Sequence, residues 1–443
     1  MSERAVAAAT RNGLPFVNSY QDKFDSLLKG MEPVGQQIFS RANEHLVSMR
    51  HTPSVPMSWL GKLRIVSDLL VHLFADSMGK DLNAVKPGWW LRTVRSTMDN
   101  FAPWLVPKPS GVISESFSYE PQKAKEENIP YINLAQVQHK QPDGITGEWV
   151  RPAHYDLDRP NSERKVVIYL PGGAYHLGSR YTHGSMSGRI AREVHCEVCV
   201  LDYSLLPEHP YPAAMNDVIT LYNHLLQQGY RPENIIFSGD SAGGHLALAA
   251  VHHIQACIYQ GKKHQQKVSS ESGLACAALA LISPTVDFHM QHLDYEGKED
   301  PIMPAKVIPH VGRSLSRHLS SSSSLKSEEV LEDPAISPGF VKLDELGGMH
   351  APVLASYGSD EVLGIGAGHF VRKLAEQGIP AGQHQGEIFH AAHLFHSYFP
   401  EADAMMIEVT DFIEHMLQTR DHRVADAAKA INKGHMDLDG FPL

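Results

Sequence analysis

With 443 residues, 42% of them hydrophobic and 20% charged, the chain has the composition of a globular protein of one large domain or two. Its formal net charge of −11 argues against nucleic-acid binding, because no basic surface is predicted to meet phosphates. Four cysteines are too few for a disulfide framework, and Cys196 and Cys199 are expected to lie in a core strand rather than to form a redox or metal pair.

Residues 1–110 are predicted to be helical and carry no chemical motif. Apolar side chains recur there at helical spacing, at Trp59, Leu63, Val66, Leu70 and Leu73. We expect this amphipathic helix to pack on the rest of the protein, with a membrane-surface role as the alternative. The most hydrophobic window, 59–74, is interrupted by charged side chains, and the N-terminus lacks the apolar segment of a signal peptide. These features predict no transmembrane segment and a cytoplasmic location.

From Val112 onward, strand and helix patterns alternate along the chain. The predicted strands are Val112–Tyr119, Gly147–Arg151, Val166–Leu170, Val198–Tyr203, Ile235–Ser238, Ala277–Ile282 and Val353–Tyr357. The predicted helices are Met215–Gln228, Gly366–Gln377 and Met405–Leu417. Continuous apolar strands alternating with helices are typical of a mostly parallel, doubly wound central sheet flanked by helices. The sequence therefore predicts an α/β protein over residues 111–420.

Two further segments depart from this alternation. Residues 287–348 show little periodicity and contain the serine run 320–324, which predicts an insertion with a flexible loop. Residues 421–443 are predicted to form a polar C-terminal tail.

The motif that organises the chain is G-x-S-x-G, formed by Gly239, Ser241 and Gly243. A predicted strand precedes it and a predicted helix follows it, so the serine lies at a sharp strand-to-helix turn. Such a turn exposes the serine hydroxyl and leaves the N–H of Ala242 available to an oxyanion. The pattern favours a nucleophilic serine over a surface serine in a glycine-rich turn.

A nucleophilic serine requires a base, an orienting acid and oxyanion donors. The small-residue loop Pro171–Tyr175 follows a buried strand and is the candidate for the donors. The base is expected to be His393, which follows the strand-like Gln383–Phe389; a metal site formed with the nearby His390 and His396 is disfavoured because no acidic partner is evident.

The orienting acid is expected at the end of the strand Val353–Tyr357, where the residues themselves allow Asp360 or Glu361. Either carboxylate could hold an imidazole in the required tautomer. The resulting order along the chain is serine, acid and histidine.

Four blocks of this sequence resemble the hormone-sensitive lipase branch of the α/β-hydrolase superfamily. Tyr169–Ser179 is similar to its oxyanion block, and Asp202–Ala214 nearly repeats D-Y-R-L-A-P-E-H-P-F-P-A-A. Gly239–Gly244 matches G-D-S-A-G-G, and Asp333–Pro338 resembles D-P-x-x-S-P. The resemblance extends from about Val112 to Leu417 and implies the α/β-hydrolase fold.

The resemblance also implies roles for individual residues. It makes Ser241 the nucleophile and His393, in an H-x-F pattern, the base. Aligning the family's G-x-x-D-x-L pattern on the chain places Glu361 at the acid position, with Asp360 as the alternative. The implied oxyanion donors are Gly173, Ala174 and Ala242. Residues 1–110 would form a cap and a wall of the acyl pocket.

Two positions depart from the family's pattern. Pro171 replaces the histidine that precedes the glycines, which removes a side-chain anchor from the loop and fixes its φ. Ala174 replaces the third glycine, and its methyl group narrows the space beside the donors. His183 and His209 stand in family-like contexts and are interpreted as structural.

The sequence thus predicts a serine carboxylic-ester hydrolase that uses neither a metal nor a cofactor and acts on a small to medium hydrophobic ester. One alternative is a tailoring enzyme that uses the same triad for acyl transfer, lactone or elimination chemistry on a larger metabolite. The other is a non-catalytic binding protein, which the gibberellin receptors exemplify; those have lost the catalytic histidine. The sequence leaves a possible homodimer open.

Overall fold

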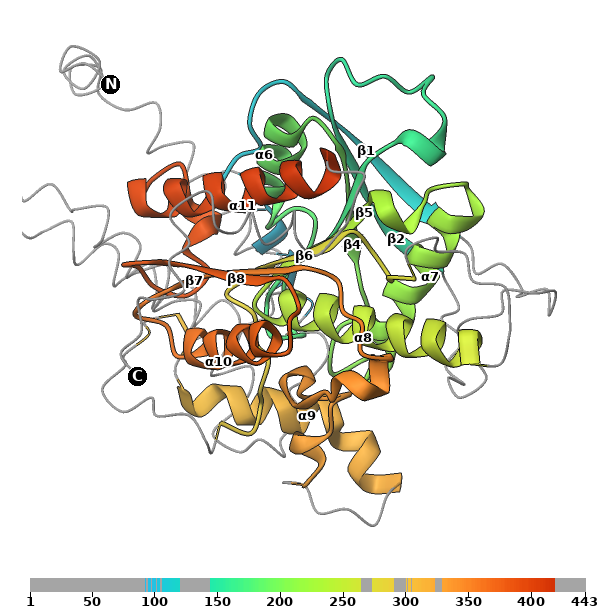
Figure 1. The fold of residues 1–443 in the computed structure, drawn as a ribbon. Helices are drawn as coiled ribbons and strands as arrows, with labels where there is room; N and C mark the ends of the chain where they lie inside the picture. Colours follow the sequence, from blue (N-terminus) through green and yellow to red (C-terminus); the bar gives the residue numbers. More distant parts are fainter. Residues whose placement is uncertain are drawn as a thin grey trace, which may run out of the picture.

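The computed structural model describes parts of residues 92–119 and the segments 144–263, 273–290, 300–322 except 301 and 304, and 329–418. The predicted helix 59–73 and the predicted tail 421–443 lie outside these residues. A single eight-stranded sheet runs through the middle of the described part, with helices on both faces (Figure 1).

The strand order across the sheet is β1-β2-β4-β3-β5-β6-β7-β8. The strands are β1 (Val112–Tyr119), β2 (Ile145–Pro152), β3 (Val166–Leu170), β4 (Glu197–Asp202), β5 (Ile235–Asp240), β6 (Ala278–Ile282), β7 (Val353–Gly358) and β8 (Ala381–Gly386). Strands β3 to β8 pair in parallel, whereas β2 is antiparallel to both β1 and β4. The predicted α/β-hydrolase fold with a mostly parallel sheet is confirmed.

Helices cover the two faces of the sheet in separate groups (Figure 1). The α-helices are α6 (Gly184–Val194), α7 (Ala213–Gln227), α8 (Ala242–Lys263), α9 (Ile308–Ser322), α10 (Leu363–Glu376) and α11 (Pro400–Gln418). Short 3-10 helices are η3 (Asn161–Glu163), η4 (Pro232–Asn234), η5 (Ala305–Val307), η6 (Glu329–Glu332), η7 (Pro338–Phe340), η8 (Leu343–Leu346) and η9 (Ala392–Phe395). Helices α6 and α11 share one apolar cluster with the sheet, and α7, α8 and α10 share another.

The central strands are apolar because both of their faces are covered. All five residues of β3 are fully buried, as are the five of β6. This burial explains why these strands appear in the sequence as continuous apolar runs rather than as alternating patterns. Cys196 and Cys199 are free and buried beside this core, as expected.

The segment 287–348 is more ordered than its sequence pattern indicated. It contains α9, whose Ile308, Val311 and Leu315 are buried at helical spacing against the core. The serine run that was expected to be a loop begins within the last turn of this helix. The prediction of little regular structure in this insertion was therefore wrong for 308–322.

Candidate active site

Ser241 lies at the turn between β5 and α8, at the carboxyl edge of the sheet. Its φ of 53° is in the left-handed region that a non-glycine residue adopts at a cost, and its N–H donates to the carbonyl of Ile282 at 2.9 Å. A Cβ on Gly243 would overlap the carbonyl oxygen of Leu170, so only glycine fits there. The predicted strand, strained turn and helix are all present.

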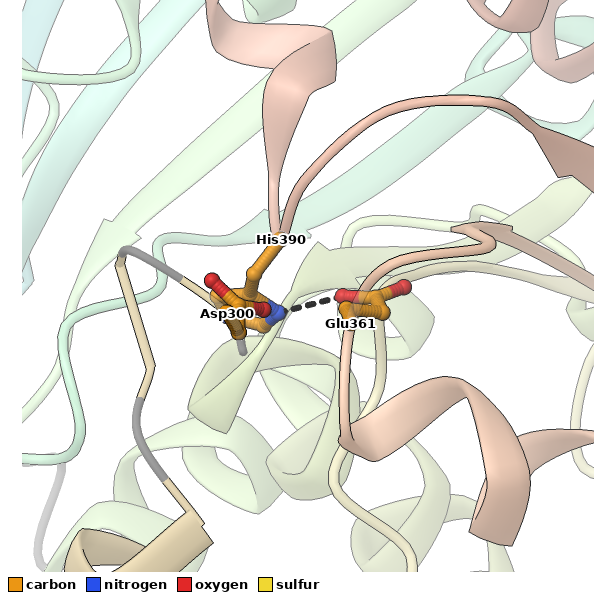
Figure 2. Close-up of side chains that lie close together, drawn as sticks. All are labelled: Asp300, Glu361 and His390. Atoms are coloured by element: carbon orange, nitrogen blue, oxygen red, sulfur yellow. Dashed lines mark hydrogen bonds and ion pairs between the residues drawn. The ribbon is translucent and has the colours of Figure 1, made fainter. Parts of the chain in front are cut away.

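A buried hydrogen-bonded chain connects Ser241 with a histidine and a glutamate. The Nε2 atom of His390 lies 2.9 Å from the Ser241 hydroxyl oxygen. The Nδ1 atom of His390 lies 2.5 Å from Oε2 of Glu361, a contact that Figure 2 shows. The other carboxylate oxygen of Glu361 accepts the N–H of Gly358 at 2.8 Å. The three side chains come from three turns at the same edge of the sheet: after β5, after β7 and after β8.

The structure corrects the predicted position of the histidine. His393 lies in η9, fully buried, with Nε2 at 2.8 Å from the Ser356 hydroxyl and not beside Ser241. Burial lowers the pKa of His393 to about 3, so the ring is neutral and structural at ordinary pH. His396 is bonded to Ser185 Oγ at 2.9 Å. Of the three neighbouring histidines, only His390 reaches Ser241.

His393 was favoured over His390 because the last strand was predicted to end too late. The prediction extended the strand to Phe389, but β8 ends at Gly386, so the turn that presents the histidine comes earlier. Ala391 adopts a φ of 52°, which turns the chain sharply after His390. A shorter strand in the prediction would have favoured His390.

The structure also separates the two candidate acids. Glu361 is fully buried and bonded to His390, whereas Asp360 is exposed and accepts the Ser359 hydroxyl at 3.1 Å. The geometry therefore agrees with Glu361 as the carboxylate that meets the imidazole.

The loop Pro171–Tyr175 is held by anchors other than a histidine side chain. Oδ1 of Asp240 accepts the N–H of Gly172 at 3.0 Å, and the Tyr203 hydroxyl donates to the carbonyl of Pro171 at 2.6 Å. Gly173 and Ala174 have positive φ values of 128° and 51°. Among the described residues, neither of their N–H groups donates to a protein acceptor.

The electrostatics of the site favour a histidine that accepts a proton. Burial lowers the pKa of His390, but the hydrogen bond and charge of Glu361 raise it, as do the charges of Asp300 and Asp240, and the net shift is upward. Burial raises the pKa of Asp240, whereas contacts with His183 and Tyr169 lower it, and the net shift is downward. A proton taken from Ser241 would therefore be stabilised on the imidazole.

The two histidines interpreted as structural occupy different positions. His183 contacts Asp240, with its Nε2 3.1 Å from Oδ1, and so supports the aspartate that anchors the loop. His209 is exposed, and its backbone N–H donates to Leu205 at 3.0 Å.

Asp300, Glu361 and His390 are buried and offer ligand-type atoms within 4.8 Å of one another, the one group of this kind in the described part of the chain. Two atoms on one tetrahedral zinc ion with bonds near 2.1 Å lie about 3.4 Å apart. The 2.5 Å between His390 Nδ1 and Glu361 Oε2 is shorter and fits a shared proton instead. The group is best described as an acid–base cluster.

The described part of the predicted cap contacts the loop region that follows Ala174, and Arg95 makes several of these contacts. The guanidinium of Arg95 donates to the carbonyls of His176 and Leu206, at 2.8 and 2.6 Å, and forms an ion pair with Glu208. This contact joins the segment before β1 to the loop that follows Ala174. The rest of the predicted cap up to residue 91 lies outside the described residues.

A family model described as the alpha/beta hydrolase fold matches residues 167–397. This range includes Ser241, Glu361 and His390. The chain belongs to the α/β-hydrolase family. A second model, described as steryl acetyl hydrolase, matches residues 57–272.

Named relatives of this α/β-hydrolase are esterases. An esterase of Acinetobacter venetianus is 29% identical over 61% of this chain and 78% of its own. An acetyl-hydrolase of Streptomyces hygroscopicus is 30% identical over 58% of this chain and 75% of its own. A crystal structure of an esterase from the bacterial hormone-sensitive lipase family shares the fold, with a TM-score of 0.56, 22% identity, and coverage of 79% of this chain and 98% of that one.

The family match and these relatives confirm the predicted α/β-hydrolase superfamily and the predicted activity. The protein is a serine carboxylic-ester hydrolase, so the non-catalytic alternative is set aside. No helix in the described segments is long and apolar enough to cross a membrane.

Proposed function

We propose that this α/β-hydrolase cleaves carboxylic esters through an acyl-enzyme on Ser241. The Ser241 hydroxyl attacks the acyl carbonyl while His390 takes its proton as general base. His390 then returns the proton to the leaving alcohol and activates the water that releases the acid. Glu361 holds the imidazole in the tautomer with Nδ1–H and stabilises the imidazolium.

The observation that carries this proposal is the hydrogen-bonded series of Ser241, His390 and Glu361. His390 Nε2 lies 2.9 Å from Ser241 Oγ, and His390 Nδ1 lies 2.5 Å from Glu361 Oε2. A nucleophile within hydrogen-bond reach of a base, which is itself oriented by a third group, is the arrangement that serine catalysis requires. The strained turn at Ser241 supports the same role, since it presents the hydroxyl at the edge of the sheet.

We assign the oxyanion hole to the N–H groups of Gly173, Ala174 and Ala242. The anchors at Gly172 and Pro171 support this assignment, because they hold the loop in place without the family's histidine. Preorganised donors of this kind stabilise the negative charge that develops on the carbonyl oxygen, and losing one donor costs roughly 10²- to 10³-fold in kcat.

For the substrate, we propose an acetyl or similarly short acyl ester of a large hydrophobic alcohol such as a sterol. Two similarities support this class: the steryl acetyl hydrolase model over residues 57–272 and the acetyl-hydrolase relative. That model extends into the predicted cap, which we propose shapes the pocket for the alcohol. The proposed acyl group is as small as the sequence led us to expect, whereas the proposed alcohol is larger than the small to medium hydrophobic ester predicted there.

The test begins with a matched pair, wild type and Ser241→Ala. An organophosphate should label Ser241 in the wild type and leave the variant unlabelled, and kcat should fall by roughly 10⁶-fold. If the variant keeps ordinary esterase activity, the mechanism is wrong.

Two series of esters then test the substrate class. Across p-nitrophenyl esters from acetate to palmitate, kcat/KM should be greatest for the shortest acyl groups. Steryl acetate should be cleaved and steryl oleate should not. A preference for long acyl chains would contradict the proposed class, and acyl transfer to an added alcohol in place of hydrolysis would favour the tailoring-enzyme alternative.

A further inference from the structure

A second carboxylate lies beside the proposed triad and comes from the insertion 287–348. Asp300 is 5% exposed, and its Oδ1 atom accepts the N–H groups of Ile302 and Met303 at 2.8 and 3.1 Å. Its Oδ2 atom is buried and has no hydrogen-bond partner in the described part of the protein. The backbone bonds hold the carboxylate in place, so the unpaired oxygen is a fixed feature of the site.

This carboxylate faces the histidine that the triad uses. Figure 2 shows Asp300 and Glu361 next to the imidazole of His390, with the hydrogen bond on the Glu361 side. The three groups lie within 4.8 Å of one another. A buried carboxylate oxygen without a partner is unfavourable, and a cation beside it removes that cost. The imidazolium formed when Ser241 loses its proton is such a cation.

We propose that Asp300 is a positioning residue that, together with Glu361, stabilises the imidazolium of His390. The inference rests on the proposed function, since it requires His390 to gain a proton during turnover. Glu361 would set the tautomer and orientation of the ring, and Asp300 would add a second negative charge at the moment of proton transfer.

The other charges around His390 fit this division of roles. The charges that raise its pKa are those of Glu361 after β7, Asp300 in the insertion and Asp240 at the end of β5. The buried His393 is electrostatically coupled to His390 and is itself neutral. Burial and, to a smaller extent, the charge of Glu361 raise the pKa of Asp300, the charge of His390 and the two backbone hydrogen bonds lower it, and the net shift is upward. The negative charge of Asp300 therefore favours protonated His390, and protonated His390 favours ionised Asp300. This is the coupling expected of a carboxylate paired with a transient cation.

The decisive experiment compares Asp300→Asn with the wild type across pH. Asparagine keeps an oxygen that can accept the Ile302 and Met303 N–H groups, removes the charge, and replaces Oδ2 with an NH2 group of similar size. We expect the plateau kcat to fall by about 4- to 350-fold, the range that Coulomb attraction across 4.8 Å gives between the dielectric constant of water and an effective value near 20 in the protein. Because the lost charge favoured protonated His390, the acid limb of kcat/KM should move to lower pH.

Asp287→Asn is the matched control. The Oδ1 atom of Asp287 also accepts two backbone N–H groups, from His289 and Met290 at 2.7 and 3.4 Å, but its charge is not among those that shift the pKa of His390. This variant should leave the acid limb in place. A lower kcat in Asp300→Asn with an unmoved acid limb would mean a purely structural role and would overturn the inference.

Two more results separate this inference from its alternatives. Loss of activity on chelation with EDTA, restored by Zn²⁺, would make the cluster a metal site and overturn it; unchanged activity in EDTA supports it. Organophosphate labelling of Ser241 in Asp300→Asn shows that the proposed function still holds when the inference alone fails. If Ser241→Ala retains activity, the proposed function itself has failed.

Discussion

The choice between His390 and His393 provides the sharpest test of the site. The two residues lie three positions apart and are both buried, but only His390 contacts Ser241, while His393 is bonded to Ser356. His390→Ala and His393→Ala therefore remove side chains of the same size from the same segment. We expect His390→Ala to lose catalytic activity and His393→Ala to lose stability.

In His390→Ala the base is missing, and kcat should fall by roughly 10⁶-fold, as when a single triad histidine is removed from a serine hydrolase. The hydrogen bonds of Ser241 Oγ and Glu361 Oε2 to the ring, at 2.9 and 2.5 Å, are lost with it. In His393→Ala the triad remains, so kcat should stay within about 10-fold of the wild type.

The cost of His393→Ala should appear in stability instead. The variant leaves a cavity at a fully buried position and removes the partner of the Ser356 hydroxyl at 2.8 Å. Cavity formation and an unsatisfied buried hydroxyl together should cost about 2–4 kcal/mol in the free energy of unfolding. Urea denaturation followed by circular dichroism measures this cost, and p-nitrophenyl acetate hydrolysis measures kcat.

The reasoning is refuted if the folded fraction of His393→Ala loses 10⁴-fold or more in kcat while His390→Ala retains activity. The role of the base would then move back to the residue indicated by the H-x-F pattern. Activity must be normalised to organophosphate-reactive protein for His393→Ala, because its lower stability reduces the folded fraction.

Two further predictions concern the acid and the oxyanion loop. Glu361→Gln should lower kcat by about 10⁴-fold, because an amide at this position favours the wrong imidazole tautomer, whereas the exposed Asp360→Asn should change kcat less than about 3-fold; the opposite ranking in steady-state assays would make Asp360 the acid. Ala174→Gly should raise kcat/KM for tert-butyl acetate relative to ethyl acetate, because the Ala174 methyl restricts the loop while its N–H remains a donor. An unchanged ratio of the two kcat/KM values would place control of the alcohol side elsewhere, in the proposed cap.

The sequence alone was sufficient for the features that depend on neighbouring residues. Val166–Leu170 was predicted as a strand buried on both faces because a short, continuous apolar run is typical of such strands. The turn at Ser241 was predictable because its glycines are needed locally, where a Cβ would overlap backbone atoms. The family-like blocks around these elements specified the fold and the chemistry.

Only the tertiary structure decided which distant groups meet. Three histidines within seven residues are equally polar in sequence, and the one that reaches Ser241 depends on where β8 ends and how the chain turns at Ala391. Glu361 and Asp360 are adjacent, and they differ in burial and in contact, since only Glu361 is buried and meets His390. Asp300 lies in a segment without a recognisable pattern. Its position beside His390 is a long-range contact, and no local propensity encodes a contact between residues 90 positions apart.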